Sequence, residues 1–414
     1  MRMKHLIVIS LLLSSLVYCR ADEPFRVHRY SLFAQLPPAP HSTVFIGNSI
    51  TDMFPWNEAF GSLAVCNRGV SGALSGEILL HIDDLVGDSP ERCFLMIGTN
   101  DLQLGVEPVR LASTVDSIIL RIQSLSPSTE IYLQSILPST NGKRRVDQEK
   151  DANRLLARVA ASRGVVFVDL FNDMMSIVSD TAYSLDKLHL TACAYAEWCR
   201  RIEALVGASS RMEPSLLQTA TSSAFGNSHR MRISYFPPMP CENDDILFFG
   251  DELVKGGEWA ELMGNPHWKN RGTGWGYDGQ EDNLAICDAI VSASPIPNGA
   301  RVVLYTGVGN INGAEPLAQV EERYQGLVDK ILQKNGAADL YVVSLLPTQE
   351  PNPRIKQFNR WLRELSRTNA AIHYVDAFSA LSSKDKCLPP FFMGNYLSGE
   401  GYLRLASLLR QEVR

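Results

Sequence analysis

Ser49 stands in the stretch Val44-Phe45-Ile46-Gly47-Asn48-Ser49-Ile50-Thr51, directly after a run of apolar residues. A serine that follows a strand and begins a helix can be exposed at the edge of a sheet and act as a nucleophile. Asn and Ser are also ordinary helix N-caps, so the motif alone does not distinguish catalysis from capping. It is not the nucleophile elbow of lipases, because Thr51 stands where that motif has its second glycine.

Asp186-Lys187-Leu188-His189 offers the two groups that a serine nucleophile requires. In acyl transfer by serine, a base takes the hydroxyl proton and a carboxylate holds that base in the correct tautomer. A separation of three residues lets one turn present a carboxylate and an imidazole together. An isolated Asp and His at this spacing is common. Its value here is its place, a loop after the last predicted strand and just before a predicted helix.

Two further segments place candidate oxyanion donors after predicted strands. Asn67-Arg68-Gly69 follows the second strand, where a glycine lets a backbone N–H approach a reacting carbonyl closely. A left-handed turn would use the glycine equally well. Gly98-Thr99-Asn100-Asp101 follows the third strand, and Asn100 can donate its side-chain amide to an oxyanion. Asn and Asp also support ordinary turns, so the segment alone leaves both interpretations open.

Short apolar runs alternate with longer amphipathic ones in the first half of the chain. Continuous apolar runs predict parallel strands buried on both faces, and they cover Thr43–Gly47, Leu63–Asn67, Cys93–Gly98, Glu130–Ile136 and Val165–Asp169. Helical spacing is found in residues 108–122, 151–163 and 192–206. The alternation predicts an α/β fold with a doubly wound parallel sheet. Ligands bind beyond the carboxyl ends of such strands, which is where Ser49, Gly69 and Asn100 fall.

The second half of the chain repeats the first. Phe45-Ile46-Gly47-Asn48-Ser49 returns as Phe248-Phe249-Gly250-Asp251-Glu252, and Asn67-Arg68-Gly69 returns as Asn270-Arg271-Gly272, both at an offset of 203 residues. Later matches keep nearly the same offset, which indicates two copies of one domain and not a solenoid. We predict a first, catalytic domain at 22–207, a linker rich in Ser, Thr and Ala at 208–228 and a second domain at 229–414.

Together and in this order, the four segments of the first copy resemble the sequence blocks of the SGNH or GDSL hydrolase superfamily. The resemblance runs from about residue 43 to residue 195. It implies two tandem three-layer αβα domains of flavodoxin-like type, each with a mainly parallel five-stranded sheet. It also implies that Ser49 is the nucleophile, His189 the general base and then acid, and Asp186 the carboxylate that orients the histidine.

The same resemblance implies an oxyanion hole. Its donors would be the backbone N–H of Ser49, the backbone N–H of Gly69 and the side chain of Asn100. Each such donor contributes roughly 10²–10³ in rate. Asn48 stands where the family usually has Asp. Because it is a short polar residue beside the nucleophile, this departure leaves the mechanism intact.

The second copy lacks the residues of this mechanism. The repeat places Glu252, Tyr396 and Met393 opposite the nucleophile, the base and the carboxylate. An amide survives nearby at Asn310 if the register of that block is kept. Asp251 and Glu252 would allow an acid–base pair of another kind, but a retired site explains all the losses more simply. We predict that this degenerate domain packs on the first, shapes its substrate cleft or binds glycan.

The first residues predict a cleaved signal peptide at 1–21. Arg2 and Lys4 precede an apolar run from Leu6 to Val17, and Cys19-Arg20-Ala21 offers small residues for cleavage. The run is too short for a comfortable membrane span. A lipidated cysteine and an uncleaved anchor are the alternatives, and the bulky Tyr18 before the cysteine argues against lipidation. We expect a secreted or periplasmic protein.

The composition excludes several classes of function. With 45% hydrophobic and 20% charged residues, the chain is typical of globular proteins. Loss of the leader changes the formal charge from −6 to −9, which argues against nucleic acid or anionic membranes as partners. Seven of the eight cysteines remain, without C-x-x-C spacing, so neither a disulfide framework nor a zinc site is predicted. We expect no cofactor, no metal and no stable membrane insertion. The expected partner is a small-molecule or glycan ester substrate.

The second copy also bears on the substrate. Its segments Gly250-Asp251-Glu252-Leu253-Val254, Gly256-Gly257-Glu258-Trp259 and Lys269-Asn270-Arg271-Gly272 look like exported bacterial esterases related to sialate O-acetylesterases and to the platelet-activating-factor acetylhydrolase-like group. This favours a short acyl ester, such as acetyl on a sugar. A lysophospholipase or other lipid-directed esterase is one alternative, and a non-catalytic binding protein with both domains retired is another.

Overall fold

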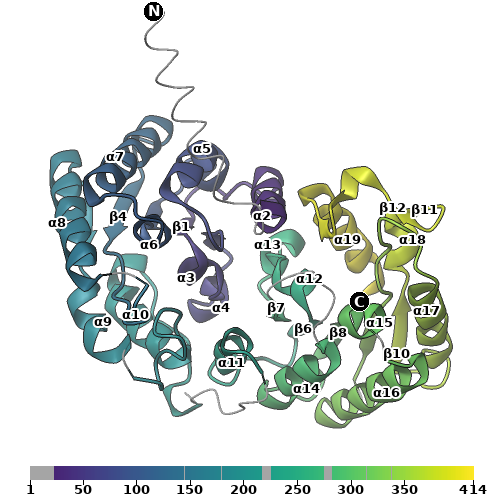
Figure 1. Cartoon of the computed structure of the whole chain (residues 1–414). Helices are drawn as coiled ribbons and strands as arrows, with labels where there is room; N and C mark the ends of the chain where they lie inside the picture. Colours follow the sequence, from purple (N-terminus) through teal and green to yellow (C-terminus); the bar gives the residue numbers. More distant parts are fainter. Residues whose placement is uncertain are drawn as a thin grey trace, which may run out of the picture.

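The computed structural model describes residues 23–143, 145–178, 180–216, 225–274, 282–313, 315–336 and 338–414. Within these ranges the chain forms two lobes that lie side by side, the first half of the sequence in one and the second half in the other (Figure 1). The predicted signal peptide lies outside the described residues, as does part of the predicted linker. The boundaries of the two domains therefore stay a prediction.

The first lobe is built on a five-stranded parallel sheet in the order β2-β1-β3-β4-β5. Its strands are β1 (Thr43–Gly47), β2 (Val65–Gly69), β3 (Arg92–Met96), β4 (Glu130–Gln134) and β5 (Val166–Val168). Each predicted strand is present, with its ends shifted by at most two residues. The central strand β1 is buried along its whole length, as the continuous apolar run predicts.

Helices cover both faces of this sheet. The helices of the first lobe are α2 (Glu23–Gln35), α3 (Ser49–Asp52), α4 (Trp56–Ala59), α5 (Ser75–Val86), α6 (Thr99–Gln103), α7 (Pro108–Leu125), α8 (Val146–Arg163), α9 (Phe171–Val178) and α10 (Ala192–Val206). Val44 and Ile46 of β1 belong to the core shared with α5, α7 and α8. Phe45, between them, belongs to the core shared with α9 and α10. This alternation along one strand produces the predicted three layers.

The second lobe repeats the same sheet in the order β10-β9-β8-β6-β7. Its strands are β6 (Ile246–Gly250), β7 (Trp268–Gly272), β8 (Arg301–Tyr305), β9 (Leu340–Val343) and β10 (Ile372–Val375). Its helices are α11 (Asn227–Ser234), α12 (Glu252–Lys255), α13 (Trp259–Met263), α14 (Asn283–Ala293), α15 (Val308–Asn312), α16 (Leu317–Lys334), α17 (Pro353–Leu365), α18 (Ala377–Leu381) and α19 (Gly399–Glu412). Two short ribbons are added, β11 (Ser382–Ser383) with β12 (Lys386–Cys387), and β13 (Phe392–Met393) with β14 (Tyr396–Leu397). The predicted fold class, two tandem α/β domains, is confirmed.

Internal hydrogen bonds repeat with the sequence. The indole N–H of Trp56 donates to Thr51 O at 2.9 Å, and 203 residues later that of Trp259 donates to Val254 O at 2.7 Å. Asn153 exchanges two hydrogen bonds with the backbone of Ile136, and Asn359 does the same with Leu345. The two lobes are thus copies in their local packing as well as in their topology.

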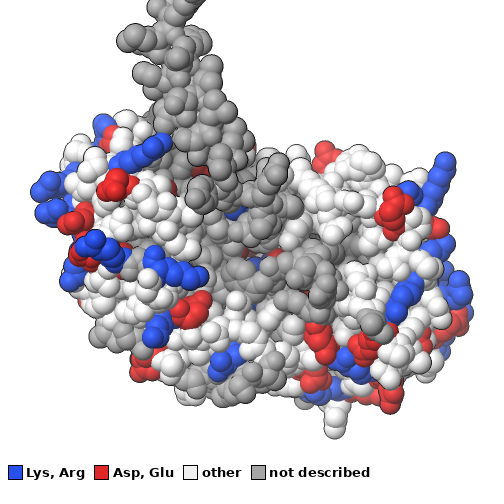
Figure 2. Space-filling view, viewed as in Figure 1, with Lys and Arg blue, Asp and Glu red and all other residues white. Residues whose placement is uncertain are grey.

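The outer flanks of both lobes carry Lys, Arg, Asp and Glu side chains that are intermingled (Figure 2). The face in view therefore shows no large area of one sign of charge. Over the described ranges, no helix combines the length and the apolar character that crossing a membrane requires.

Candidate active site

Ser49 lies at the carboxyl end of β1, where the chain turns into α3. Asn48 is the N-cap of this helix, and its Oδ1 accepts a hydrogen bond from the backbone N–H of Ile50 at 3.2 Å. Gly47 allows the turn, because a Cβ there would lie 2.2 Å from Thr51 Oγ1 and 2.5 Å from Met96 O. The capping role and the placement at the sheet edge are therefore both present, and they fix the serine at the amino end of a helix.

The three residues predicted to carry the chemistry lie in contact. Ser49 Oγ is 2.9 Å from His189 Nε2. His189 Nδ1 is in turn 2.7 Å from Asp186 Oδ2. The serine comes from β1–α3, whereas the other two come from the loop before α10, 140 residues further along the chain. The structure thus brings together side chains that the sequence relates only by pattern.

The loop that carries Asp186 and His189 is shaped by the carboxylate itself. Asp186 Oδ1 accepts the backbone N–H of His189 at 2.7 Å and that of Leu188 at 3.0 Å. Lys187 between them adopts a left-handed φ of 62°. Burial disfavours the charged carboxyl, but the hydrogen bonds and charge from His189 and the two backbone donors outweigh it, so the pKa of Asp186 lies below its ordinary value. Asp186 is therefore ionised at neutral pH.

This arrangement sets the tautomer of the histidine. A carboxylate accepts hydrogen bonds only, so His189 Nδ1 must carry the proton that faces Asp186. The lone pair of Nε2 then faces the Ser49 hydroxyl, ready to accept its proton. These are the roles of nucleophile, base and orienting carboxylate in acyl transfer by serine.

The Gly69 part of the predicted oxyanion hole does not fit the structure. Asn67-Arg68-Gly69 forms the last three residues of β2 and does not follow it. The N–H of Gly69 donates to Asn67 Oδ1 at 2.9 Å. A Cβ at Gly69 would lie 2.1 Å from the backbone N of Asp52, so the glycine instead allows β2 to pack closely on α3. Its N–H is not free for a substrate.

Gly72, which the sequence analysis missed, takes the position expected of that donor. It is the third residue of a turn from Val70 to Ala73, closed by a 3.0 Å hydrogen bond from Ala73 N to Val70 O. Its φ of 81° is the left-handed value that a type II turn requires at this position. Among the described residues, the N–H of Gly72 has no hydrogen-bond partner. A glycine two or three residues beyond the end of a strand is the pattern that would have indicated it.

The other two predicted donors are the backbone N–H of Ser49 and the side chain of Asn100. Ser49 is the first residue of α3, and within the described chain its backbone N–H, like that of Gly72, makes no hydrogen bond. Asn100, on α6, donates one side-chain N–H to Ala73 O at 3.0 Å, which holds its amide against the turn that carries Gly72. The second N–H of that amide is left for a ligand.

The second lobe keeps the backbone arrangement of the site, but its described residues differ from those of the first lobe. Glu252 begins α12 after β6, with Asp251 as N-cap, in the place that Ser49 and Asn48 take in the first lobe. The prediction that an amide survives at Asn310 is wrong. Leu284 N donates to Asn310 Oδ1 at 3.1 Å, as Ser75 N donates to Asp101 in the first lobe, so Asn310 is the counterpart of Asp101. The counterpart of Asn100 is then Gly309, which has no side chain.

The last block of the second lobe also differs. Met393 and Tyr396 face each other across the ribbon β13–β14, where the first lobe has the turn that carries its carboxylate and histidine. The register predicted for this block is supported by Thr191 and Ser398, the N-cap residues of α10 and α19. In the described part of the second lobe, no serine, histidine and carboxylate converge at this edge of the sheet.

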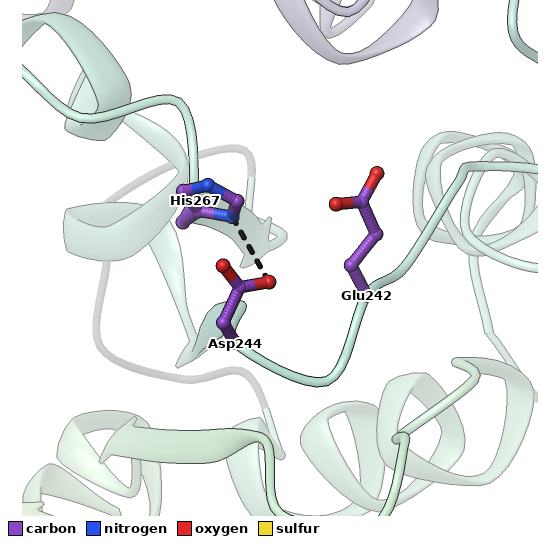
Figure 3. Close-up of side chains that lie close together, drawn as sticks. All are labelled: Glu242, Asp244 and His267. Atoms are coloured by element: carbon purple, nitrogen blue, oxygen red, sulfur yellow. Dashed lines mark ion pairs between the residues drawn. The ribbon is translucent and has the colours of Figure 1, made fainter.

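Glu242, Asp244 and His267 form the one group of potential metal ligands found among the described residues (Figure 3). Glu242 is already paired with Arg211 at 2.7 Å, and His267 Nδ1 lies 3.4 Å from Asp244. The three residues precede β6 and β7, at the amino ends of these strands, whereas the candidate active site lies at the carboxyl ends in the other lobe. Ion pairing on the surface accounts for this cluster.

Residues 45–197 match the GDSL-like lipase/acylhydrolase family. No curated protein sequence matches the chain. Among solved structures, a protein named as a platelet activating factor from Streptococcus pneumonia is 25% identical, covering 48% of this chain and 98% of its own, with a TM-score of 0.41. An acetylxylan esterase from Geobacillus stearothermophilus (18% identity, 42% and 96%, TM-score 0.33) and a lipase/acylhydrolase from Enterococcus faecalis (19% identity, 40% and 94%, TM-score 0.34) are also similar.

The family match covers all three blocks from β1 to α6 and the loop of Asp186 and His189. Residues 45–197, the greater part of the first lobe, therefore carry the sequence pattern of the GDSL-like lipase/acylhydrolase family. The contact of Ser49, His189 and Asp186 agrees with this assignment, and the protein is an ester-hydrolysing serine hydrolase.

Proposed function

We propose that this protein is an exported serine esterase that removes short acyl groups, above all acetyl, from carbohydrate. The observation that carries the proposal is the chain of contacts from Ser49 Oγ to His189 and from His189 to Asp186, at 2.9 Å and 2.7 Å. The predicted leader supports export. The resemblance of residues 250–272 to exported esterases related to sialate O-acetylesterases and to the platelet-activating-factor acetylhydrolase-like group supports a short acyl ester.

The proposed reaction has two halves. Ser49 Oγ attacks the ester carbonyl while His189 Nε2 takes the hydroxyl proton, and the negative charge on the carbonyl oxygen is held by the donors of Gly72, Asn100 and the Ser49 backbone. The tetrahedral intermediate collapses, and the alcohol leaves with the proton from His189. Water, deprotonated by His189, then attacks the acyl-enzyme and releases the carboxylic acid and free Ser49.

The exposure of the nucleophile supports a small acyl group. Ser49 is only 7% exposed, although its Oγ must meet the carbonyl carbon within bonding distance. A slender acetyl group reaches such an oxygen with less rearrangement of the surrounding chain than a long acyl chain would need. The fold itself does not select among substrates, because the same architecture serves many chemistries.

The test is a comparison of purified full-length variants on two substrate series. We expect wild-type protein to hydrolyse acetylated sugars and p-nitrophenyl acetate, with kcat/KM falling steeply for p-nitrophenyl octanoate and longer esters. Ser49→Ala should lose at least about 10³-fold in kcat. Glu252→Gln is the matched control, because it changes the counterpart of Ser49 in the second lobe, and its activity should equal that of wild type.

Each other outcome has a definite meaning. Preference for long-chain esters would replace the proposed substrate with a lipid and leave the mechanism standing. Full turnover by Ser49→Ala would remove the proposed nucleophile. No hydrolysis of any ester by the wild type, with correct folding, would favour a binding protein in which both lobes are retired.

A further inference from the structure

Two helices at the junction of the lobes, α2 and α11, each contact the opposite lobe. The helix α2 contacts α19 of the second lobe as well as α5 of its own, and α11 contacts α14 of its own lobe and, through Ser234, the first residue of α10 in the other (Figure 1). The contacts are the same on the two sides. Gly399 N donates to Ser31 Oγ at 3.0 Å, and Ala192 N donates to Ser234 Oγ at 3.0 Å.

Two buried arginines repeat this pattern. Arg29 on α2 donates to Gly69 O of its own lobe at 3.2 Å and to Gly256 O of the other at 2.8 Å. Arg232 on α11 donates to Gly272 O of its own lobe at 3.0 Å and to Met53 O of the other. Each partner differs from its counterpart by 203 residues. The leading helix of each lobe therefore contacts both lobes, and these exchanged contacts are related by an approximate two-fold axis.

These contacts between the lobes have different consequences for the two lobes. On the first lobe, α11 and the residue after it reach the loop that carries the candidate base and carboxylate. Tyr235 Oη donates to Leu190 O at 2.9 Å, next to His189 in sequence. Asn227 Nδ2 donates to Leu185 O at 3.2 Å, next to Asp186. With the bond from Ala192 N to Ser234, α11 and the residue after it hold this segment at three backbone positions.

We propose that Ser234 and Tyr235 are positioning residues for the reaction at Ser49, and that holding this loop is what the second domain contributes to catalysis. The proposal rests on the proposed serine mechanism. The two side chains touch neither substrate nor reacting atoms, and they act through the backbone that directly follows His189. Ser234 and Tyr235 are buried, so each contact is made in a site from which water is excluded.

The need for such support follows from the geometry of the loop. His189 reaches Ser49 from a turn whose middle residue, Lys187, has a left-handed φ of 62°, not from a regular element. A displacement of about 1 Å between reacting groups costs up to about 10²-fold in rate. Loss of a hydrogen bond beside the histidine should therefore lower kcat by more than the accompanying loss of folding stability would explain.

The pseudo-symmetry supplies a matched control. Ser31 and Ser234 each donate to the carbonyl three residues earlier, and each accepts a backbone N–H of the opposite lobe. Ser31→Ala and Ser234→Ala remove the same interactions, but only Ser234 lies against the loop of the candidate active site. The comparison separates a catalytic effect from a general loss of docking.

The experiment measures, in the full-length protein, the rate at which a fluorophosphonate labels Ser49. Labelling forms the Oγ–P bond and expels fluoride while His189 takes the hydroxyl proton, so it reports on the triad whatever the natural ester is. We expect Ser234→Ala and Tyr235→Phe to label about 10-fold more slowly than wild type and to lower kcat on p-nitrophenyl acetate with little change in KM. Ser31→Ala should label at the wild-type rate, with the same loss of Tm as Ser234→Ala.

The proposal fails if Ser234→Ala and Tyr235→Phe label as fast as wild type, or if Ser31→Ala is slowed as much as Ser234→Ala. Tyr235→Phe keeps the inference testable should Ser234→Ala not fold, because it removes only one hydroxyl. Failure of the proposed function is distinguishable, since Ser49→Ala would then label or turn over like wild type.

Discussion

At the scale of single residues, Asp186 combines two tasks that its spacing from His189 makes possible. One carboxylate oxygen accepts the imidazole N–H, and the other accepts two backbone N–H groups of its own loop. Asp186 thus holds the loop with Oδ1 and sets the histidine tautomer with Oδ2. Replacing the carboxylate with an amide separates these tasks, because an amide has one accepting oxygen atom and one donating nitrogen atom.

We therefore predict that Asp186→Asn keeps the fold and loses the reaction. The amide oxygen remains with the two backbone N–H groups, and its NH₂ then faces His189 Nδ1, which drives the ring into the wrong tautomer. The expected loss in kcat is about 10³–10⁴-fold, with a Tm close to that of wild type. Asp180→Asn, at an aspartate that accepts the N–H of Ala182 in the same segment, is the control and should remain active. An unchanged kcat in Asp186→Asn would remove this residue from the triad.

The contrast between Gly69 and Gly72 shows which site residues the sequence predicts. Ser49, Asp186, His189 and Asn100 carry distinctive side chains, so their types and spacing identify them. A backbone donor has no such mark. Which N–H is open depends on where β2 ends and on a side chain, Asn67, that occupies the N–H of Gly69. The alignment of the block around Asn310 with the first lobe is the same kind of problem, and the hydrogen bond from Leu284 N to Asn310 Oδ1 resolves it.

At the scale of elements, periodicity predicted the helices α7, α8 and α10 and the five strands of the first sheet, because buried faces leave a pattern in the sequence. The helix α7 buries Leu111, Val115, Ile118, Ile119 and Ile122 as the spacing requires. The helices α3 and α6 have four and five residues, too few for a periodic pattern. The surroundings of α2 were also not predictable, since they come from the opposite end of the chain.

His28 on α2 illustrates what these surroundings do. It is buried and stacks on Tyr396 with ring centroids 4.9 Å apart, and the ring centroid of Tyr402 lies 6.1 Å away. Burial, and then the charges of Arg29 and Lys255, hold the pKa of His28 well below its ordinary value of 6.5. The histidine is therefore neutral in the folded protein, whereas it takes a proton in the unfolded chain once the pH falls below 6.5.

This difference predicts a pH-dependent stability. Since the unfolded state then binds one more proton, the free energy of unfolding should fall by up to about 1.4 kcal/mol for each pH unit below the ordinary histidine pKa. His28→Phe keeps an aromatic ring between α2 and β14 and removes the titrating group. Urea unfolding at pH 7.5 and at pH 5.5 should show a smaller decrease for His28→Phe than for wild type. Equal decreases in the two proteins would show that His28 does not cause the effect.

At the scale of the whole molecule, the lobes meet through charges that obey the same approximate two-fold symmetry as the contacts of α2 and α11. Arg68 binds Glu261 with both of its terminal nitrogens, at 3.0 and 2.7 Å, and Arg271 binds Glu58 at 2.7 Å. An interface in which i contacts j and j contacts i is the signature of a symmetric dimer. The tandem chain is thus built like a dimer whose two subunits are joined in one polypeptide.

These ion pairs could not be predicted from the sequence, because Arg68 and Arg271 lie inside a block that was interpreted only for its glycine. Their carboxylate partners, Glu261 on α13 and Glu58 on α4, follow the strands β6 and β1 of the opposite lobes. The side chains of Arg271 and Glu58 are 0% and 1% exposed. Removing one member of such a pair leaves a buried charge without compensation, which costs about 3–5 kcal/mol, whereas replacing both with apolar residues is often nearly neutral.

We therefore expect Arg271→Met to lower the free energy of unfolding by about 3–5 kcal/mol, and Glu58→Leu with Arg271→Met to recover most of that loss. Arg121, whose ion pair with Asp83 lies on the surface, gives the matched control, and Arg121→Met should cost far less, because solvent screens an exposed ion pair. Urea unfolding of the full-length variants measures all three. A loss in Arg271→Met no larger than that in Arg121→Met would mean that the interdomain pair is not buried in solution, and that the lobes open there.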